Sequence, residues 1–553
     1  MTKYNLKSLK LPVLTGAGLK AFTAAVENPV SRVFLIDTLL ENGGIPILRK
    51  LILNEEPTFF PLVKPESGAH EKAGRFEPGA QPKDFPYRTA RDYTEAYKQG
   101  TLSPVEAAEK VLAAIEASEH EGTPLRTFIA IYRDDVIAQA KASAERYKNH
   151  KTLGLLDGVP VAIKDEIDML PYPTTVGTRF LGKSPALEDS TVAARLRAAG
   201  ALLVGKTNMH EIGINPNGCN ANFGSIRNPY DTNCDTGGSS SGSAAAVAAG
   251  LVPIAIGADG GGSIRIPASM CGVVGLKPTF ARISEKGAAP LCWSVAHLGP
   301  LAASVEDAAL AYSIIAGPDE HEPNTLEQPE VTLTDWQKPG LKGVRLGIYK
   351  EWFEHASPEV VKAGYAMLEQ YKKLGAQVIE IEIPELNEMR VAHAVTILAE
   401  MALCMRDHAE HEKEHALAVR LSLVLGRLFT AMDYINAQRM RTRALAIFAN
   451  VFKQVDVILT PGTALAAQPV PAGGYEVGWS DLGVDTEMMR FVFPGNLTGL
   501  PGITFPVGYD SRGLPIGMQA IGRHWEENLL LRVAYNAEQV VQRVTPKRYY
   551  RVF

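Results

Sequence analysis

The chain has few cysteines and no CxxC motif. Its 553 residues contain 5 cysteines, the first at Cys219 and the last at Cys404. Disulfide frameworks belong mainly to short secreted chains with an even number of cysteines. An odd, widely spread set predicts reduced thiols in an intracellular protein.

The chain also lacks an excess of charge of one sign. Lys and Arg number 56 against 61 Asp and Glu, for a net charge of −5. There is no global attraction for a phosphate backbone, and we expect no nucleic-acid partner. A hydrophobic fraction of 46% and a charged fraction of 21% exclude a disordered or collagenous protein. At roughly 100–200 residues per domain, the length allows one large domain or up to four.

No segment has the pattern of a signal peptide or a transmembrane helix. Thr15 and Lys20 interrupt the apolar stretch near the N-terminus. The uncharged run Thr236–Ala258 is long enough to cross a bilayer, but its first half is polar and glycine-rich, and Gly250 and Pro253 break the rest. We therefore expect a cytoplasmic or peripherally membrane-associated protein.

Residues 1–88 are predicted to form an N-terminal helical segment and a linker arm. The apolar runs Val33–Leu40 and Ile45–Leu53 are separated by two glycines, which suggests two short helices. A stretch rich in proline, glycine and charge, Glu55–Pro86, follows as the arm. The helices either cover the main body or form a contact with a membrane surface or a second copy in a homodimer.

Residues 89–553 are predicted to form one α/β domain. Ser103, Pro104 and Glu106 make a capping box that starts a helix, and short apolar strands alternate with further helices. This alternation indicates a large mixed β-sheet sandwiched between helical layers. A stretch with no proline and a single glycine predicts a helical insertion over about 386–453.

A zinc-peptidase pattern occurs in this insertion. His411 and His415 satisfy H-E-x-x-H, which on a helix places two imidazoles on one face for zinc. The surrounding residues are almost continuously charged, and no third ligand follows. We predict a solvated helix or loop with no metal, and keep a zinc peptidase as a remote alternative.

A second group of candidate catalytic residues has three parts, of which the first is a lysine. The apolar segment Leu156–Asp168 places Lys164 at the end of a predicted strand. Burial disfavours the charged form of a lysine, so that it can act as a base. The alternative is a structural ion pair with Asp165.

The other two parts are rich in glycine and serine. Thr236–Gly250 runs directly into an uncharged small-residue helix, so it is not a linker. In Gly257–Pro267, successive glycines precede Ser263 and can turn their N–H groups towards one point, as an oxyanion site requires, with the serine as nucleophile. We expect Asp259 and Arg265 to support this loop. The predicted oxyanion donors are the N–H groups of Gly260, Gly261, Gly262 and Ser263.

The chain resembles the amidase signature family in three segments taken together: Lys164, the GGSSSGSAA run and DGGGSIRIPASMCGVVGLKPT. The resemblance implies the amidase signature fold and the hydrolysis of carboxylic amides through an acyl-enzyme by a Ser–cis-Ser–Lys triad. The triad residues would be Lys164 as base, Ser239 as the cis-serine and Ser263 as the acylated serine. No cofactor is implied. The segment Asn496–Gly522 also matches the family's C-terminal part.

Within this family the chain is most similar to plant-type fatty acid amide hydrolases. The similarity includes EEPTFFP at 55–61, PELNEMRVAH at 384–393 and EMMRFVFPGNLTGLP at 487–501. It implies a small-molecule amide substrate with a lipid acyl chain, such as an N-acylethanolamine. The alternatives are an amidase for short-chain or aryl amides and a glutamine amidotransferase subunit. No motif determines the acyl-chain length or the amine.

Overall fold

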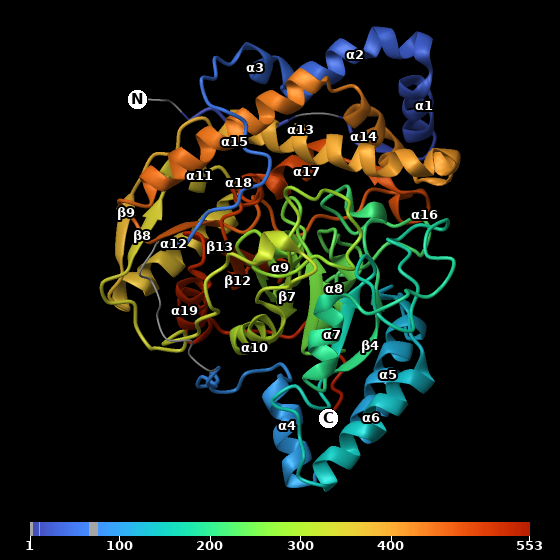
Figure 1. Ribbon diagram of the computed structural model, residues 1–553, viewed down its shortest axis with the longest axis vertical. Helices are drawn as coiled ribbons and strands as arrows, with labels where there is room; N and C mark the ends of the chain where they lie inside the picture. The colour runs from blue at the N-terminus through green and yellow to red at the C-terminus, as the bar shows by residue number, and fades with distance from the viewer. Residues whose placement is uncertain (1–3, 10–11, 66–75) are drawn as a thin grey trace.

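The computed structural model describes residues 4–9, 12–65 and 76–553 (Figure 1). Part of the predicted linker arm, residues 66–75, lies outside the described residues. Among the described helices, none combines the length and the low polarity needed to cross a bilayer.

The centre of the molecule is an 11-stranded mixed sheet in the order β2-β4-β3-β5-β7-β6-β12-β13-β10-β8-β9. Strands β4, β3 and β5 run parallel, as do β10, β8 and β9, and the pairs between these two groups are antiparallel. This confirms the predicted α/β fold with a mixed sheet. The strands are β2 (Phe128–Ala130), β3 (Pro160–Lys164), β4 (Leu202–Thr207), β5 (Ile254–Ala258), β6 (Val274–Lys277), β7 (Leu298–Ala302), β8 (Arg345–Ile348), β9 (Gln377–Glu380), β10 (Val457–Pro461), β12 (Gly502–Tyr509) and β13 (Pro515–Gly522).

Alternate residues of each strand point to opposite sides of the sheet. Helices cover both of these faces. In β3, Val161 and Ile163 join one hydrophobic core and Ala162 joins another. Helices α4 (Ala90–Gln99), α7 (Thr191–Ala198), α10 (Val305–Ile315), α12 (Pro358–Lys373) and α19 (Glu527–Glu538) pack into the first core. The second core contains α5 (Pro104–His120), α6 (Arg133–Lys148), α8 (Ser241–Ala248) and α9 (Arg265–Cys271).

Helix α5 shows how local sequence places an element. Ser103 Oγ accepts a hydrogen bond from the backbone N–H of Glu106 at 3.2 Å, and Glu106 Oε2 accepts one from the N–H of Ser103 at 2.8 Å. Both halves of the predicted capping box are therefore present.

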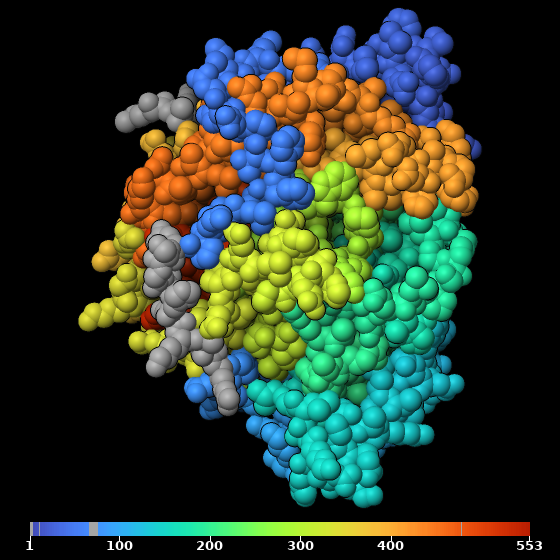
Figure 2. Space-filling model, in the orientation of Figure 1, coloured from blue at the N-terminus to red at the C-terminus, as the bar shows by residue number. Residues whose placement is uncertain are grey.

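The insertion and the N-terminal helices pack together along one side of the molecule, in orange and blue in Figures 1 and 2. The N-terminal helices are α1 (Gly16–Glu27), α2 (Pro29–Gly43) and α3 (Ile45–Lys50), and the insertion contains α13 (Leu386–Cys404), the 3₁₀ helix η3 (Met405–Glu414), α14 (Leu417–Arg427) and α15 (Ala431–Val451). Helix α3 contacts α13 and α15, and α1 contacts α14.

Shorter elements connect these layers. Strands β1 (Leu14–Thr15) and β11 (Trp479–Ser480) form a separate antiparallel pair, which joins the N-terminal segment to the C-terminal part of the chain. The remaining elements are η1 (Glu211–Gly213), η2 (Pro323–Thr325), α11 (Lys350–Phe353), α16 (Gly474–Val477), α17 (Leu482–Met489) and α18 (Phe493–Thr498).

Candidate active site

The last residue of strand β3 is Lys164, as the sequence predicts. Its position in the alternation matches that of Ala162, on the face that α8 and α9 cover. The side chain is 1% exposed. The strand therefore delivers a lysine into the interior of the molecule, beside the start of α8.

A direct hydrogen bond links this lysine to the first serine of the SSS run. Lys164 Nζ lies 2.8 Å from Ser239 Oγ and 3.4 Å from the carbonyl oxygen of Ala258. Ser239 is buried, and the peptide bond between Gly238 and Ser239 is cis. Two residues that are 75 positions apart in the chain thus meet at hydrogen-bonding distance.

The two serines after Ser239 hold the loop in place. Ser240 Oγ donates to the carbonyl of Ala258 at 3.0 Å, and Ser241 Oγ donates to the carbonyl of Gly237 at 2.7 Å. Gly238 is required here, because a Cβ at this position would lie 2.2 Å from the carbonyl oxygen of Asn217.

Ser263 lies on the loop between β5 and α9. The backbone N–H of Ser240 donates to the Ser263 carbonyl at 3.1 Å, so the segment that carries Ser239 packs directly against the one that carries Ser263. Ser263 is 8% exposed, more than Lys164 or Ser239. The structure thus brings the three predicted triad positions into one buried region.

An ion pair supports the loop from inside. Arg265 Nε and Nη2 donate to the two carboxylate oxygens of Asp259, each at 3.0 Å, and both side chains are fully buried. Asp259 Oδ1 also accepts the N–H of Gly262 at 2.7 Å. This N–H, one of the four predicted oxyanion donors, is therefore engaged by a carboxylate in this structure. Gly262 has φ +107°, a conformation that favours glycine.

The C-terminal segment reaches the same carboxylate. Asn496 Nδ2 donates to Asp259 Oδ1 at 2.9 Å and to the Asp259 carbonyl at 2.8 Å. Burial alone would raise the pKa of Asp259, but the charges of Arg265 and Lys277 and the hydrogen bonds from Arg265 and Asn496 lower it below its ordinary value. Asp259 therefore stays charged and holds the loop shape.

A family model described as Amidase matches residues 106–531. The chain belongs to the amidase family. This is the membership that the lysine, the serine run and the glycine-rich loop indicated, and it makes the protein an amidohydrolase.

Individual relatives extend the match to almost the whole chain. A fatty acid amide hydrolase of Oryza sativa subsp. indica is 39% identical over 573 aligned residues, covering 97% of this chain and 94% of that protein. A glutamyl-tRNA(Gln) amidotransferase subunit of Cyanothece sp. is 36% identical, covering 80% of this chain and 97% of that protein. Among solved structures, the peptide amidase of Stenotrophomonas maltophilia superposes with a TM-score of 0.71 at 28% identity, over 84% of this chain and 99% of that one.

An acidic residue that the motifs did not single out lies beside Lys164. Glu166 Oε2 lies 3.0 Å from Lys164 Nζ. Asp165, the partner considered from the sequence, instead pairs with Lys206 at 3.7 Å. A carboxylate two positions after the lysine is visible in the KDEID sequence, but the turn that brings it back onto the lysine is not.

The helical insertion supplies a histidine to the oxyanion loop. His393 on α13 lies with Nε2 2.8 Å from the carbonyl oxygen of Gly260. Burial lowers the pKa of His393 to about 4, so the ring is neutral near pH 7 and donates through Nε2–H. The PELNEMRVAH segment ends on this residue.

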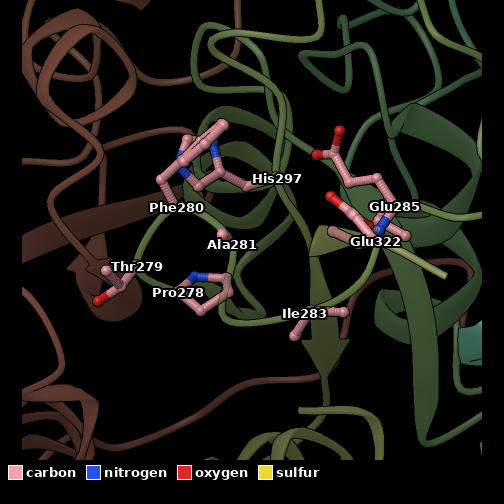
Figure 3. Close-up of a pocket in the computed structure, with 9 residues that line it drawn as sticks. Pro278, Thr279, Phe280, Ala281, Ile283, Glu285, His297 and Glu322 are labelled. Atoms are coloured by element: carbon pink, nitrogen blue, oxygen red, sulfur yellow. Dashed lines mark hydrogen bonds between the residues drawn. The ribbon is translucent and has the colours of Figure 1, made fainter. Parts of the chain in front are cut away.

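A small cavity lies behind the same loop (Figure 3). His297, Glu285 and Glu322 are among the residues that line it, and the His297 carbonyl accepts the N–H of Asp259 at 2.8 Å. None of the three predicted triad residues lines this cavity. It therefore adjoins the residues that support the loop rather than the predicted triad.

The H-E-x-x-H segment does not form the face that zinc would need. His415 Nδ1 lies 2.6 Å from Glu211 Oε1, and both side chains are buried. His411 instead stacks on Phe180 and contacts Glu414 at 2.6 Å. Within the described ranges, no group of three or more His, Cys, Asp or Glu side chains is arranged to hold a metal ion. The expectation of a fully solvated segment was wrong for His415, because Glu211 binds it in the interior.

Proposed function

We propose that this amidase hydrolyses fatty acid amides such as N-acylethanolamines to a fatty acid and an amine. The observation that carries the proposal is an apolar wall that begins at the oxyanion loop. We define this wall as Met209, Ile212, Leu291, Cys292 and Met401, which belong to one hydrophobic cluster, together with Ile397, which is partly buried and packs against that cluster.

Two glycines show how close the wall comes to the predicted reacting groups. A Cβ on Gly260 would lie 2.6 Å from Cys292 Sγ and 3.3 Å from Ile397 Cδ1. A Cβ on Gly213 would lie 3.2 Å from Ser239 Oγ and 3.8 Å from Leu291 Cδ1. An amide carbonyl at Ser263 would therefore direct its acyl chain along apolar side chains, where each methylene removed from water gains about 0.8 kcal/mol.

The proposed reaction uses Lys164 in its neutral form. Ser263 Oγ attacks the amide carbonyl carbon while its proton passes to Ser239, whose own proton passes to Lys164 Nζ. The relay then reverses: Ser239 protonates the leaving nitrogen, the C–N bond breaks and the acyl-enzyme remains. Water hydrolyses the acyl-enzyme through the same relay. The 2.8 Å contact between Lys164 and Ser239 supports the transfer from Ser239 to the lysine.

The oxyanion of the tetrahedral intermediate would accept hydrogen bonds from backbone N–H groups. Since Asp259 engages the N–H of Gly262, the proposed donors are those of Gly260, Gly261 and Ser263. One well-placed donor stabilises the transition state by about 3–4 kcal/mol. His393 and Asp259 hold the loop from opposite sides, which keeps these donors oriented.

Rates on a series of acyl ethanolamides test the substrate class. With chains from acetyl to oleoyl beside acetanilide, kcat/KM should rise with chain length and be low for the anilide. Ser263→Ala should abolish every activity. A preference for acetyl ethanolamide or acetanilide would contradict the fatty-amide assignment.

The first alternative is an amidase for short or aryl amides, or a glutamine amidotransferase subunit. The amidotransferase relative matches 80% of this chain, whereas the rice hydrolase matches 97%. The larger overlap favours a fatty amide. The remote alternative, a zinc peptidase, predicts loss of activity on chelation, whereas the proposed mechanism predicts none.

Membrane association and dimerisation remain predictions for the N-terminal helices. Val30, Val33 and Phe34 on α2 form an exposed apolar strip, with Phe34 80% exposed. Such a strip suits contact with a lipid surface or a second copy. Phe34→Ser should abolish sedimentation with phosphatidylcholine vesicles in the first case, and convert a dimer to a monomer in light scattering in the second.

A further inference from the structure

Three oxygens lie close to the side-chain nitrogen of Lys164 in this structure. Nζ donates hydrogen bonds to Ser239 Oγ at 2.8 Å and to the Ala258 carbonyl oxygen at 3.4 Å, and it forms an ion pair with Glu166 Oε2 at 3.0 Å. An ion pair with a carboxylate favours the protonated form of a lysine. The resting geometry therefore suits the charged lysine, although the proposed reaction starts from the neutral one.

Of the three oxygens around Lys164 Nζ, that of the Glu166 carboxylate favours the charged lysine most strongly. It faces Lys164 in a buried site, and the Glu166 side chain is only 9% exposed. Water therefore weakens the ion pair little. By contrast, Asp165 is directed to Lys206.

Three further titratable groups lie near Lys164 or Glu166, and burial favours the neutral form of each. Burial lowers the pKa of His210 to about 4, and it raises the pKa of the Cys292 thiol well above its ordinary value. Burial also raises the pKa of Glu285 well above the usual carboxyl range. Among these described groups, Glu166 is the one whose side chain forms an ion pair with the lysine, at 3.0 Å.

We propose that Glu166 is a positioning residue that holds Lys164 in its charged, inactive form and thereby sets the lower pH limit of the triad. Activation is then the loss of one proton from the ammonium group to solvent as the pH rises, which leaves a lone pair for the proton of Ser239. The inference rests on the proposed role of Lys164 as the base and adds what controls it.

The test compares wild type with Glu166→Gln, which keeps the size and a hydrogen-bond acceptor but removes the charge. The matched control is Glu188→Gln, whose parent carboxylate also lies 3.0 Å from a lysine, Lys286, but is 71% exposed. The readout is the second-order rate at which an alkyl fluorophosphonate labels Ser263, followed from about pH 5 to about pH 10. In that reaction the Ser263 oxygen–phosphorus bond forms, fluoride leaves and the serine proton passes through Ser239 to Lys164.

We expect the acid limb of the Glu166→Gln profile to move to lower pH by at least about one unit, which is about a tenfold gain in rate on the acid side. Glu166→Ala should move it in the same direction, and Glu188→Gln should superimpose on wild type. A gain of rate at low pH cannot come from misfolding. An unchanged limb, or a limb moved to higher pH, would overturn the proposal.

Loss of labelling at every pH in a folded Glu166→Gln protein would also overturn the proposal. Glu166 would then take part in the proton transfer itself instead of only positioning Lys164. Parallel kcat/KM profiles with oleoyl ethanolamide separate this inference from the substrate assignment. If labelling shifts but the ethanolamide is not cleaved, the inference stands and the substrate assignment fails. If the probe does not label wild-type Ser263, the proposed triad fails and the inference with it.

Discussion

The catalytic loops and the helical insertion are built in different ways. The loops at the ends of β3 and β5 are held by buried charges and by hydrogen bonds to backbone groups, such as those of Asp259 with Arg265 and Gly262. The insertion α13–α15 touches the site through a few side chains, among them His393 and Ile397. The proposed bond-breaking groups and the proposed substrate contacts thus have different supports, which His393 links through its hydrogen bond to Gly260. It follows that mutations should be able to change one without the other.

The largest effect should follow from removing a reacting group on the catalytic loops. Ser263→Ala or Lys164→Ala should lower kcat by about 10⁴-fold or more, since members of a triad act as a unit. Steady-state rates with oleoyl ethanolamide measure this, and circular dichroism checks the fold. A residual rate within tenfold of wild type would remove that residue from the mechanism.

The next largest effect should follow from breaking the support of these loops. Arg265→Leu leaves the Asp259 carboxylate buried without its partner, which costs about 3–5 kcal/mol of the free energy of unfolding. Denaturant titration measures this loss. Lys372→Met, which removes an exposed pair with Glu369, is the control and should change stability by less than about 0.5 kcal/mol.

The Asp259–Arg265 pair also predicts a dependence of stability on pH. The folded-state pKa of Asp259 is lowered, so its contribution is present above the unfolded-state pKa of about 4 and is lost as the pH falls below it. Wild type should therefore lose more stability than Asp259→Asn on acidification from neutral pH to about pH 3. Equal losses in the two proteins would show that the pair does not stabilise the fold.

A smaller effect should follow from cutting the link between the two regions. His393→Ala removes the donor to the Gly260 carbonyl and should lower kcat by about 10- to 100-fold with little change in KM, because the oxyanion donors lose their alignment. His393→Gln, whose amide N–H can donate to the same carbonyl, should recover part of the rate. A rise in KM alone would mean that His393 contacts substrate instead.

The smallest effect should come from the apolar wall of the insertion. Ile397→Ala should lower kcat/KM for oleoyl ethanolamide by about tenfold and leave acetyl ethanolamide nearly unchanged, since the lost contacts serve only a long chain. Leu403→Ala, an exposed position at the end of the same helix, is the control. Equal losses on both substrates would place Ile397 in the support of the loop.

Much of the architecture could be predicted from local patterns. The helix that starts after Ser103, the lysine that ends β3 and the helices over 386–453 follow from caps, apolar runs and the absence of proline. Strand β9, by contrast, covers only Gln377–Glu380, half of the stretch 376–383 in which apolar residues recur. Periodicity indicates that an element exists more reliably than it indicates its ends.

The contacts around the candidate site were much less predictable. His393 meets Gly260 across 133 positions, His415 meets Glu211 across 204, and Asn496 meets Asp259 across 237. No local pattern in any one segment indicates a partner this far along the chain. Even Glu166, only two positions from Lys164, could not be assigned, because its direction depends on the turn after β3.

The sequence alone determined the fold class, the family and the candidate reacting residues, because short-range chemistry in the lysine strand and the glycine-serine loops indicates them. Only the tertiary structure decided that Asp259 engages the N–H of Gly262, that Glu166 faces Lys164, and which apolar side chains pack near Gly260. The physical reason is that these properties depend on burial and on distances between remote segments. Both are created only when the sheet and the insertion pack together.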